Sequence, residues 1–124
     1  MVSMNNSPSV SNNISDALLA VGLTVEETGT LVEKVPPATS GLLLYGSRAR
    51  GDYVETSDYD FLCLSDQTHP TIKVGRASVS TYSPKQLSSA SGTLFGTHLL
   101  RDGVVIYDPQ RKLAKAVLGL RPAE

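Results

Sequence analysis

The sequence lacks tryptophan, contains a single cysteine and has no long hydrophobic run. One cysteine, Cys63, cannot form a disulfide within the chain, and its apolar neighbours are typical of a small buried side chain rather than of a reactive thiol. No apolar run approaches the about 20 residues that a membrane-spanning helix needs. Because the N-terminal residues also lack the basic start and apolar stretch of a signal peptide, we expect a cytoplasmic protein without a membrane partner.

The sequence also lacks an excess of charge of either sign. It has 11 Lys and Arg residues against 12 Asp and Glu residues, a net charge of −1, so any site for a polyanion must be local. The 124 residues, 40% of them hydrophobic, suffice for one domain with a modest core. Residues 1–12 are polar and have little to bury, so we expect them to be disordered and residues 13–124 to form the domain.

Hydrophobic periodicity predicts both helices and strands, and we expect an α/β (α+β) domain in which a small mixed or antiparallel sheet is flanked by helices. Helices are expected at about residues 14–21, 25–35, 84–91, 94–102 and 109–118, and strands at 41–45, 58–64, 72–82 and 104–107. The strand at 41–45 is continuously apolar, which is typical of a strand buried on both faces. Thr24 and Glu27 form the T-x-x-E capping box that opens the second helix.

The segment 41–64 carries the chemistry, and its first part is a turn after a buried strand. Gly46 lets the chain turn sharply and lets the backbone approach a ligand closely. Ser47 is expected to cap a short helix, whose free amides and partial positive charge favour a phosphate. Arg48 and Arg50 add full positive charges nearby. These four residues are the predicted nucleotide-binding group.

The second part of the segment is a pair of carboxylates, Asp58 and Asp60, on one face of a strand. At about 3.3 Å of rise per residue their Cα atoms lie about 7 Å apart, and two like charges there repel each other. A hard divalent cation removes that conflict, and Mg²⁺ commonly shares such oxygen ligands with substrate phosphates. Two ions are compatible with this chemistry. The pair is therefore predicted to bind metal and to be catalytic.

The strings GSRARGD and SDYDF, at this spacing, resemble the signature of the polymerase-β-like nucleotidyltransferases, most closely the minimal nucleotidyltransferase (MNT) branch. The resemblance implies a sheet with helices on one side, Mg²⁺, and transfer of a nucleoside monophosphate, such as AMP, from a triphosphate to a protein or RNA acceptor. Carried onto this sequence, Gly46 and Ser47 would bind phosphate, and Asp58 and Asp60 would bind metal and act in catalysis.

One departure from the family pattern bears on catalysis. The family usually has a third carboxylate on the next strand, which here is best matched by residues 76–82 and contains no acid. Ser78 or Ser80 occupies the likely place, and the spacing supports neither Glu55 nor Asp66 as a substitute. The alternative function is therefore a weak or inactive module that acts as an antitoxin-like or regulatory partner. Members of this branch often pair with a HEPN-type ribonuclease.

Purely structural roles remain open for each of these residues. Gly46 and Ser47 also suit a simple strand-to-helix turn, and Asp60 also suits an ion pair with Arg48 or Arg50. The sequence does not determine which base or acceptor is preferred. It also leaves open whether the chain forms a homo-oligomer or depends on a partner.

Overall fold

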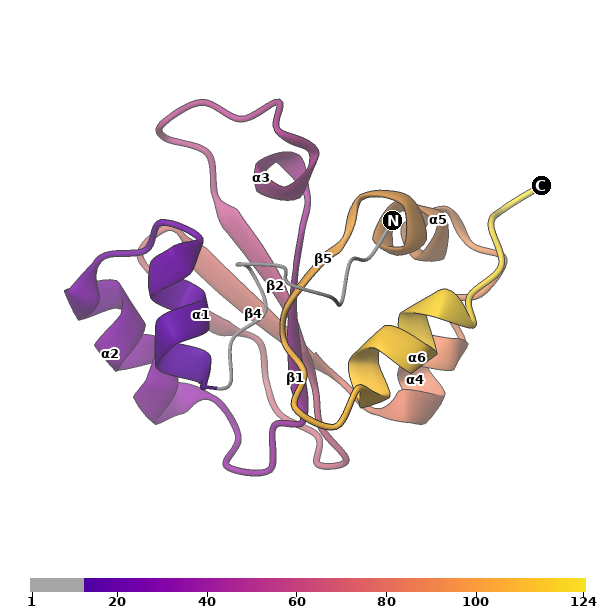
Figure 1. The fold of residues 1–124 in the computed structure, drawn as a ribbon, viewed down its shortest axis with the longest axis horizontal. Coiled ribbons are helices and arrows are strands. Elements are labelled where there is room, and N and C mark those ends of the chain that lie inside the picture. Colours follow the sequence, from indigo (N-terminus) through magenta and orange to yellow (C-terminus); the bar gives the residue numbers. More distant parts are fainter. Residues whose placement is uncertain (1–12) are drawn as a thin grey trace.

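The computed structural model describes residues 13–124 as a five-stranded sheet between two groups of helices (Figure 1). The strands are β1 (Gly41–Tyr45), β2 (Tyr59–Leu64), β3 (Ile72–Val74), β4 (Ala77–Tyr82) and β5 (Val104–Tyr107). The helices are α1 (Ile14–Ala20), α2 (Val25–Lys34), α3 (Ser47–Arg50), α4 (Pro84–Ser88), α5 (Leu94–Asp102) and α6 (Lys112–Leu118). Residues 1–12, for which we expected disorder, lie outside the described part.

The sheet is mixed, which confirms the predicted fold class. Its strand order is β3-β4-β2-β1-β5, with β2 and β4 parallel and the other neighbours antiparallel. Two of the three inner strands, β1 and β2, are the most apolar in sequence and the most buried. The apolar runs therefore occupy the middle of the sheet, where both faces are covered. No helix in residues 13–124 is long and apolar enough to cross a membrane.

Helices cover both faces of the sheet, so the one-sided arrangement implied by the resemblance is wrong for this chain. Helices α1 and α2 pack on the face of Leu42, Leu44 and Phe61, whereas α4, α5 and α6 pack on the face of Leu43 and Leu62 (Figure 1). Because β1 places large apolar side chains on alternate faces, each face needs its own cover. The α1/α2 face and the α4–α6 face are referred to by these names below.

Residues 72–82 form two strands, not the single strand that we expected. The chain reverses at Gly75 and Arg76, where the glycine has a φ of 55°. That left-handed conformation favours glycine and suits a two-residue hairpin turn. As a result, β3 becomes the edge strand and Lys73 pairs with Ser78 of β4.

Short polar motifs set where several helices begin. The expected capping box of Thr24 and Glu27 is present, with both of its hydrogen bonds. The last helix begins at Lys112, later than predicted. The buried carboxylate of Asp108, which precedes the helix, accepts hydrogen bonds from the amides of Leu113 (3.0 Å) and Ala114 (2.8 Å). Asp108 thus satisfies amides that the helix itself leaves unpaired.

Candidate functional site

The corner after β1 is in contact with Asp60. Gly46 has a φ of 79°, and a Cβ built at this position would lie only 2.6 Å from Asp60 Oδ2. The approach follows from the sheet register, because Tyr45, the last residue of β1, pairs with Asp60 on β2. Any side chain at position 46 would therefore strain the backbone and displace the carboxylate.

The first turn of α3 presents free amides at this corner, but Ser47 does not cap the helix as expected. Gly46 is the N-cap residue and Ser47 is the first helical residue. The backbone N–H groups of Ser47 and Arg48 donate to no other group within residues 13–124, whereas those of Ala49 and Arg50 donate to the Gly46 carbonyl. Two unpaired donors thus lie one and two residues beyond the glycine that touches Asp60, where an anion can accept from them.

The two aspartates share one electrostatic environment. Asp58 is exposed and directly precedes β2, while Asp60 is half-buried on the strand itself. Burial raises the pKa of Asp60, the negative charge of Asp58 raises it further, and the positive charge of Lys73 lowers it. A cation shared by both carboxylates would relieve the burial and the repulsion together. This donor set therefore fits a hard ion such as Mg²⁺.

A row of paired residues runs across the sheet at the level of Asp60. On the β4 side Asp60 pairs with Ser78, and Ser78 pairs with Lys73 on β3. Ser78 therefore lies beside Asp60 without supplying a carboxylate, and no cluster of three His, Cys, Asp or Glu side chains able to hold a metal occurs within residues 13–124. Sequence reasoning missed Lys73, because its position beside the acids depends on the unexpected turn at Gly75.

Aromatic side chains form the wall of the site on the α4–α6 face. The rings of Tyr45 and Phe95 meet edge to face at 5.5 Å, and Tyr82 stacks on Phe95 at 5.9 Å. Burial raises the pKa of the Tyr45 hydroxyl, and the charge of Asp60 raises it further. Tyr45 therefore stays protonated at neutral pH beside the acid pair.

Arg48 contacts the loop between α3 and β2 instead of projecting freely from the corner. Its guanidinium donates to the carbonyls of Glu55 (2.8 Å) and Ser57 (3.1 and 3.3 Å). It also stacks on the rings of Tyr53 and Tyr59, at 4.4 and 4.3 Å from their centroids. Because Tyr59 and Asp60 point to opposite faces of β2, these contacts draw Arg48 toward the α1/α2 face. Its predicted phosphate contact remains a prediction.

The other charged candidates lie at the surface. Arg50 is exposed and forms a 3.3 Å ion pair with Asp52. The side chains of Glu55 and Asp66 are exposed, on either side of β2 in the chain. The structure therefore brings together Gly46, Asp58 and Asp60, with the Ser47 amide nearby, and leaves the two arginines outside that group.

Comparison with known proteins bears on this arrangement. Residues 29–120 match the family of the nucleotidyltransferase domain. No curated protein matches the chain. One similar solved structure is described as a toxin-antitoxin with AMP-PNP: the TM-score is 0.51, the identity 16%, and the alignment covers 77% of this chain and 82% of the other. A second is a mutant of the toxin-antitoxin MntA-HpeT, with a TM-score of 0.49, an identity of 14% and the same coverage.

The chain belongs to the nucleotidyltransferase domain family, since the match covers most of its length and includes the corner and both aspartates. This confirms the resemblance inferred from the strings around Gly46 and Asp60. At 16% identity, the likeness to the first solved structure shows the fold. It is consistent with the mixed sheet and its flanking helices.

Proposed function

We propose that this chain transfers a nucleoside monophosphate, with AMP as the first candidate, from a triphosphate to a hydroxyl of a protein or RNA acceptor. The main support is the contact between the Gly46 corner and the Asp60 carboxylate, with Asp58 beside it. The unpaired amides suit the phosphates of a metal-triphosphate complex, and the two mutually repelling carboxylates suit its metal ion.

Each group of residues has a separate task in this proposal. The amides of Ser47 and Arg48 bind phosphate oxygens, and Gly46 keeps the space between them and Asp60 free of side-chain atoms. Asp58 and Asp60 hold Mg²⁺. When bound, the ion neutralises charge on the phosphates and stabilises the leaving pyrophosphate. A second ion would meet the Ser78 hydroxyl where the family has a carboxylate, so one tightly held ion suits this chain better.

The reaction balances without a further reactant. The acceptor oxygen forms a bond to the α-phosphorus, the bond from that phosphorus to the bridging oxygen of the β-phosphate breaks, and pyrophosphate leaves. The proton of the acceptor hydroxyl passes to water, because neither Ser78 nor Ser80 offers a basic group at neutral pH. We therefore expect slow turnover.

The test measures transfer and binding separately. The full chain is incubated with α-labelled ATP, Mg²⁺ and candidate protein and RNA acceptors, and ATP binding is titrated with and without the metal. We expect labelled acceptor with the native chain, and loss of both transfer and Mg²⁺-dependent binding with Asp60→Asn. Asp66→Asn, an exposed acid in the loop after β2, is the matched control and should behave as native. Equal Mg²⁺-dependent ATP binding by all three proteins would refute the proposed site.

The second candidate is a binding module that holds the nucleotide but does not transfer it. The pairing of Asp60 with Ser78, where a third carboxylate would complete the site, favours this candidate. The similar solved structure is that of a toxin-antitoxin, which makes a HEPN-type ribonuclease a sensible partner to test. If Ser78→Asp or Ser80→Asp creates transfer that the native chain lacks, the native chain is a binder. Strong transfer by the native chain would exclude this candidate.

A further inference from the structure

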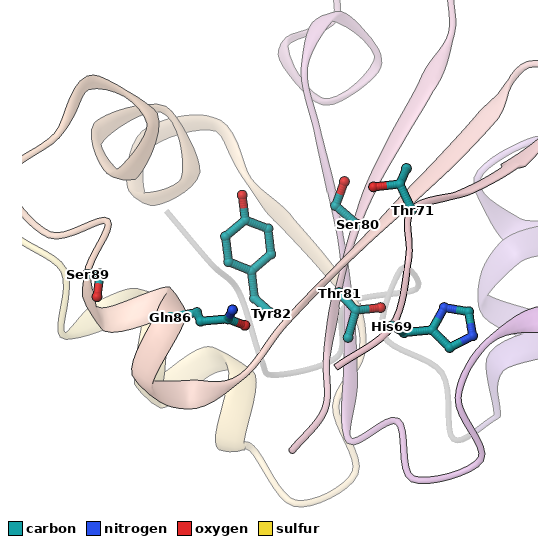
Figure 2. A pocket seen from close by; sticks show the side chains of 7 residues that line it. All are labelled: His69, Thr71, Ser80, Thr81, Tyr82, Gln86 and Ser89. Atoms are coloured by element: carbon teal, nitrogen blue, oxygen red, sulfur yellow. The ribbon is translucent and has the colours of Figure 1, made fainter. Parts of the chain in front are cut away.

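A polar pocket of about 490 Å³ lies where β4 extends beyond its edge partner (Figure 2). Strand β3 pairs with β4 only as far as Val79, so the outer edge of residues 80–82 has no neighbouring strand. The pocket lies against this unpaired end of β4. Its lining residues are His69, Thr71, Ser80, Thr81, Tyr82, Gln86 and Ser89.

The backbone of Thr81 points outward at this edge. Two hydrogen bonds show which backbone groups of β4 point toward β2. The Tyr59 amide donates to the Arg76 carbonyl (2.8 Å), and the amide of Ser65, which follows β2, donates to the Tyr82 carbonyl (3.0 Å). Even-numbered residues of β4 therefore turn their carbonyls toward β2. Because successive residues of a strand alternate, Thr81 turns its N–H and C=O toward the pocket.

Neither backbone group of Thr81 has a hydrogen-bond partner within residues 13–124. The chain that could have covered this edge leaves it before β3 begins, at Pro70, which has no N–H to donate and whose carbonyl lies 2.8 Å from Nδ1 of His69. An edge residue with both groups unpaired and a hollow beside it can accept one more strand.

We propose that an extended polypeptide segment docks along residues 80–82 as a short added strand, hydrogen-bonded to the backbone of Thr81. Backbone pairing at an open edge is a common way to bind an extended peptide. The lining side chains support a peptide over a nucleic acid, because they are hydroxyl, amide, phenol and imidazole groups without a Lys or Arg to neutralise phosphates. Such groups complement the hydroxyl and amide side chains of a polar peptide.

The docked segment would lie beside the acid pair. Ser80 is on the same face of β4 as Ser78, which pairs with Asp60. Side chains of paired residues point to one face, so the peptide residue opposite Ser80 would face the α4–α6 side, as Asp60 does. A hydroxyl-bearing residue there would suit an acceptor. This acceptor role rests on the proposed function, whereas the docking itself does not.

The test uses the full chain labelled with ¹⁵N, without nucleotide, and a synthetic Val-Thr-Tyr-Thr-Val peptide with blocked ends as the probe. We expect the largest amide shifts at residues 80–82. A set of five peptides, each N-methylated at one position, then tests the backbone pairing without any substitution in the protein. Strand pairing predicts that affinity falls about tenfold only where the methylated amide would face Thr81, so methylation at the adjacent position is the matched control.

Two further arms complete the test. Thr81→Val keeps the backbone groups and removes the hydroxyl, so its affinity for the peptide should equal that of the native chain. The proposal is overturned by shifts away from residues 80–82, by an equal effect of methylation at all positions, or by stronger binding of a five-uridine RNA to the same amides. Since no arm contains ATP, failure here is distinct from failure of nucleotide binding at Asp60.

Discussion

Two carboxylates on opposite sides of the sheet carry opposite pKa shifts. Glu27, at the start of α2, accepts a hydrogen bond from the Thr24 amide (2.9 Å) and pairs with Arg76 (3.1 Å). The first of these contacts and then the second lower its pKa. Burial and the charge of Asp58 instead raise the pKa of Asp60. The fold therefore stabilises the charge of Glu27 and disfavours that of Asp60, and such perturbed carboxyl groups are common at functional sites.

The cationic side chains follow the same division. On the α1/α2 face, Arg48 and Arg76 both lie against the ring of Tyr59, at 4.3 and 5.2 Å from its centroid, and both donate to the Glu55 carbonyl. Their positive charges hold the loop before β2. Near Asp60, by contrast, the positive charge that lowers its pKa comes from Lys73 on the edge strand. Arg48 and Arg76 thus have close partners on the α1/α2 face, whereas Asp58, Asp60 and Lys73 form no ion pair within residues 13–124.

Substitution of Gly46 should have the largest effect on the candidate site. Gly46→Ala should abolish Mg²⁺-dependent ATP binding and lower the free energy of unfolding by about 1–3 kcal/mol, because the added Cβ strains a left-handed residue and collides with Asp60. ATP titration and urea unfolding measure the two effects.

Gly51→Ala is the matched control for Gly46→Ala. Gly51 also has a positive φ, 88°, but a Cβ there meets nothing within 4 Å. Gly51→Ala should therefore lose only the stability that backbone strain removes, less than Gly46→Ala loses, and should keep ATP binding. Equal loss of binding in both variants would show that helix distortion, and not the approach to Asp60, explains the result.

Arg48→Lys should give the next largest effect, a loss of about 1–2 kcal/mol in the free energy of unfolding. Lysine keeps the charge but cannot reproduce the guanidinium fork that reaches two carbonyls while stacking on Tyr53 and Tyr59. Arg50→Lys, at an exposed ion pair, should change stability by less than about 0.5 kcal/mol. Similar losses in both variants would contradict the structural role assigned to Arg48.

Local patterns predicted much of the fold. The apolar run of β1, the alternation in β2 and the T-x-x-E box at Thr24 each depend on neighbouring residues, and each is present in the structure. The closeness of Gly46 and Asp60 was also predictable, because a turn directly after one central strand and an acid on its partner meet once the strands pair.

The missed features depend on contacts that no local pattern encodes. The contacts of Arg48 with Tyr53 and Tyr59 were not foreseen, because these rings become its neighbours only when the loop folds back. Lys73 reaches the row of Asp60 because Gly75 reverses the chain, and a glycine within an alternating segment also fits a bulge. The metal and phosphate roles of the site residues remain predictions.

Asp60→Asn should raise the stability of the chain while removing Mg²⁺-dependent ATP binding. Without metal, the apparent Tm should rise on the order of 2–4 °C at pH 7, because the variant removes a buried, repelled charge. Since the folded-state pKa is raised, the native chain gains stability relative to the variant as the pH falls through that pKa. Mg²⁺ should raise the Tm of the native chain alone, and a variant less stable than the native chain without metal would contradict this account. Thermal unfolding from pH 4 to 8 measures both effects.

Glu27→Gln should have the smallest effect and the opposite sign. Glutamine can still accept the bond from the Thr24 amide, so the variant loses only the charge facing Arg76, about 0.5 kcal/mol at neutral pH. Because the folded-state pKa of Glu27 is lowered, its contribution is present above the ordinary glutamate range and is lost as the pH falls through that lowered pKa. The stability difference between the native chain and Glu27→Gln should therefore shrink on acidification, as measured by urea unfolding at several pH values. Arg76→Gln should remove only part of that pH dependence, because the Thr24 amide is the larger cause of the lowered pKa. If the pH dependence persists unchanged in Arg76→Gln, the Thr24 amide alone lowers the pKa of Glu27, and the ion pair with Arg76 contributes nothing to it.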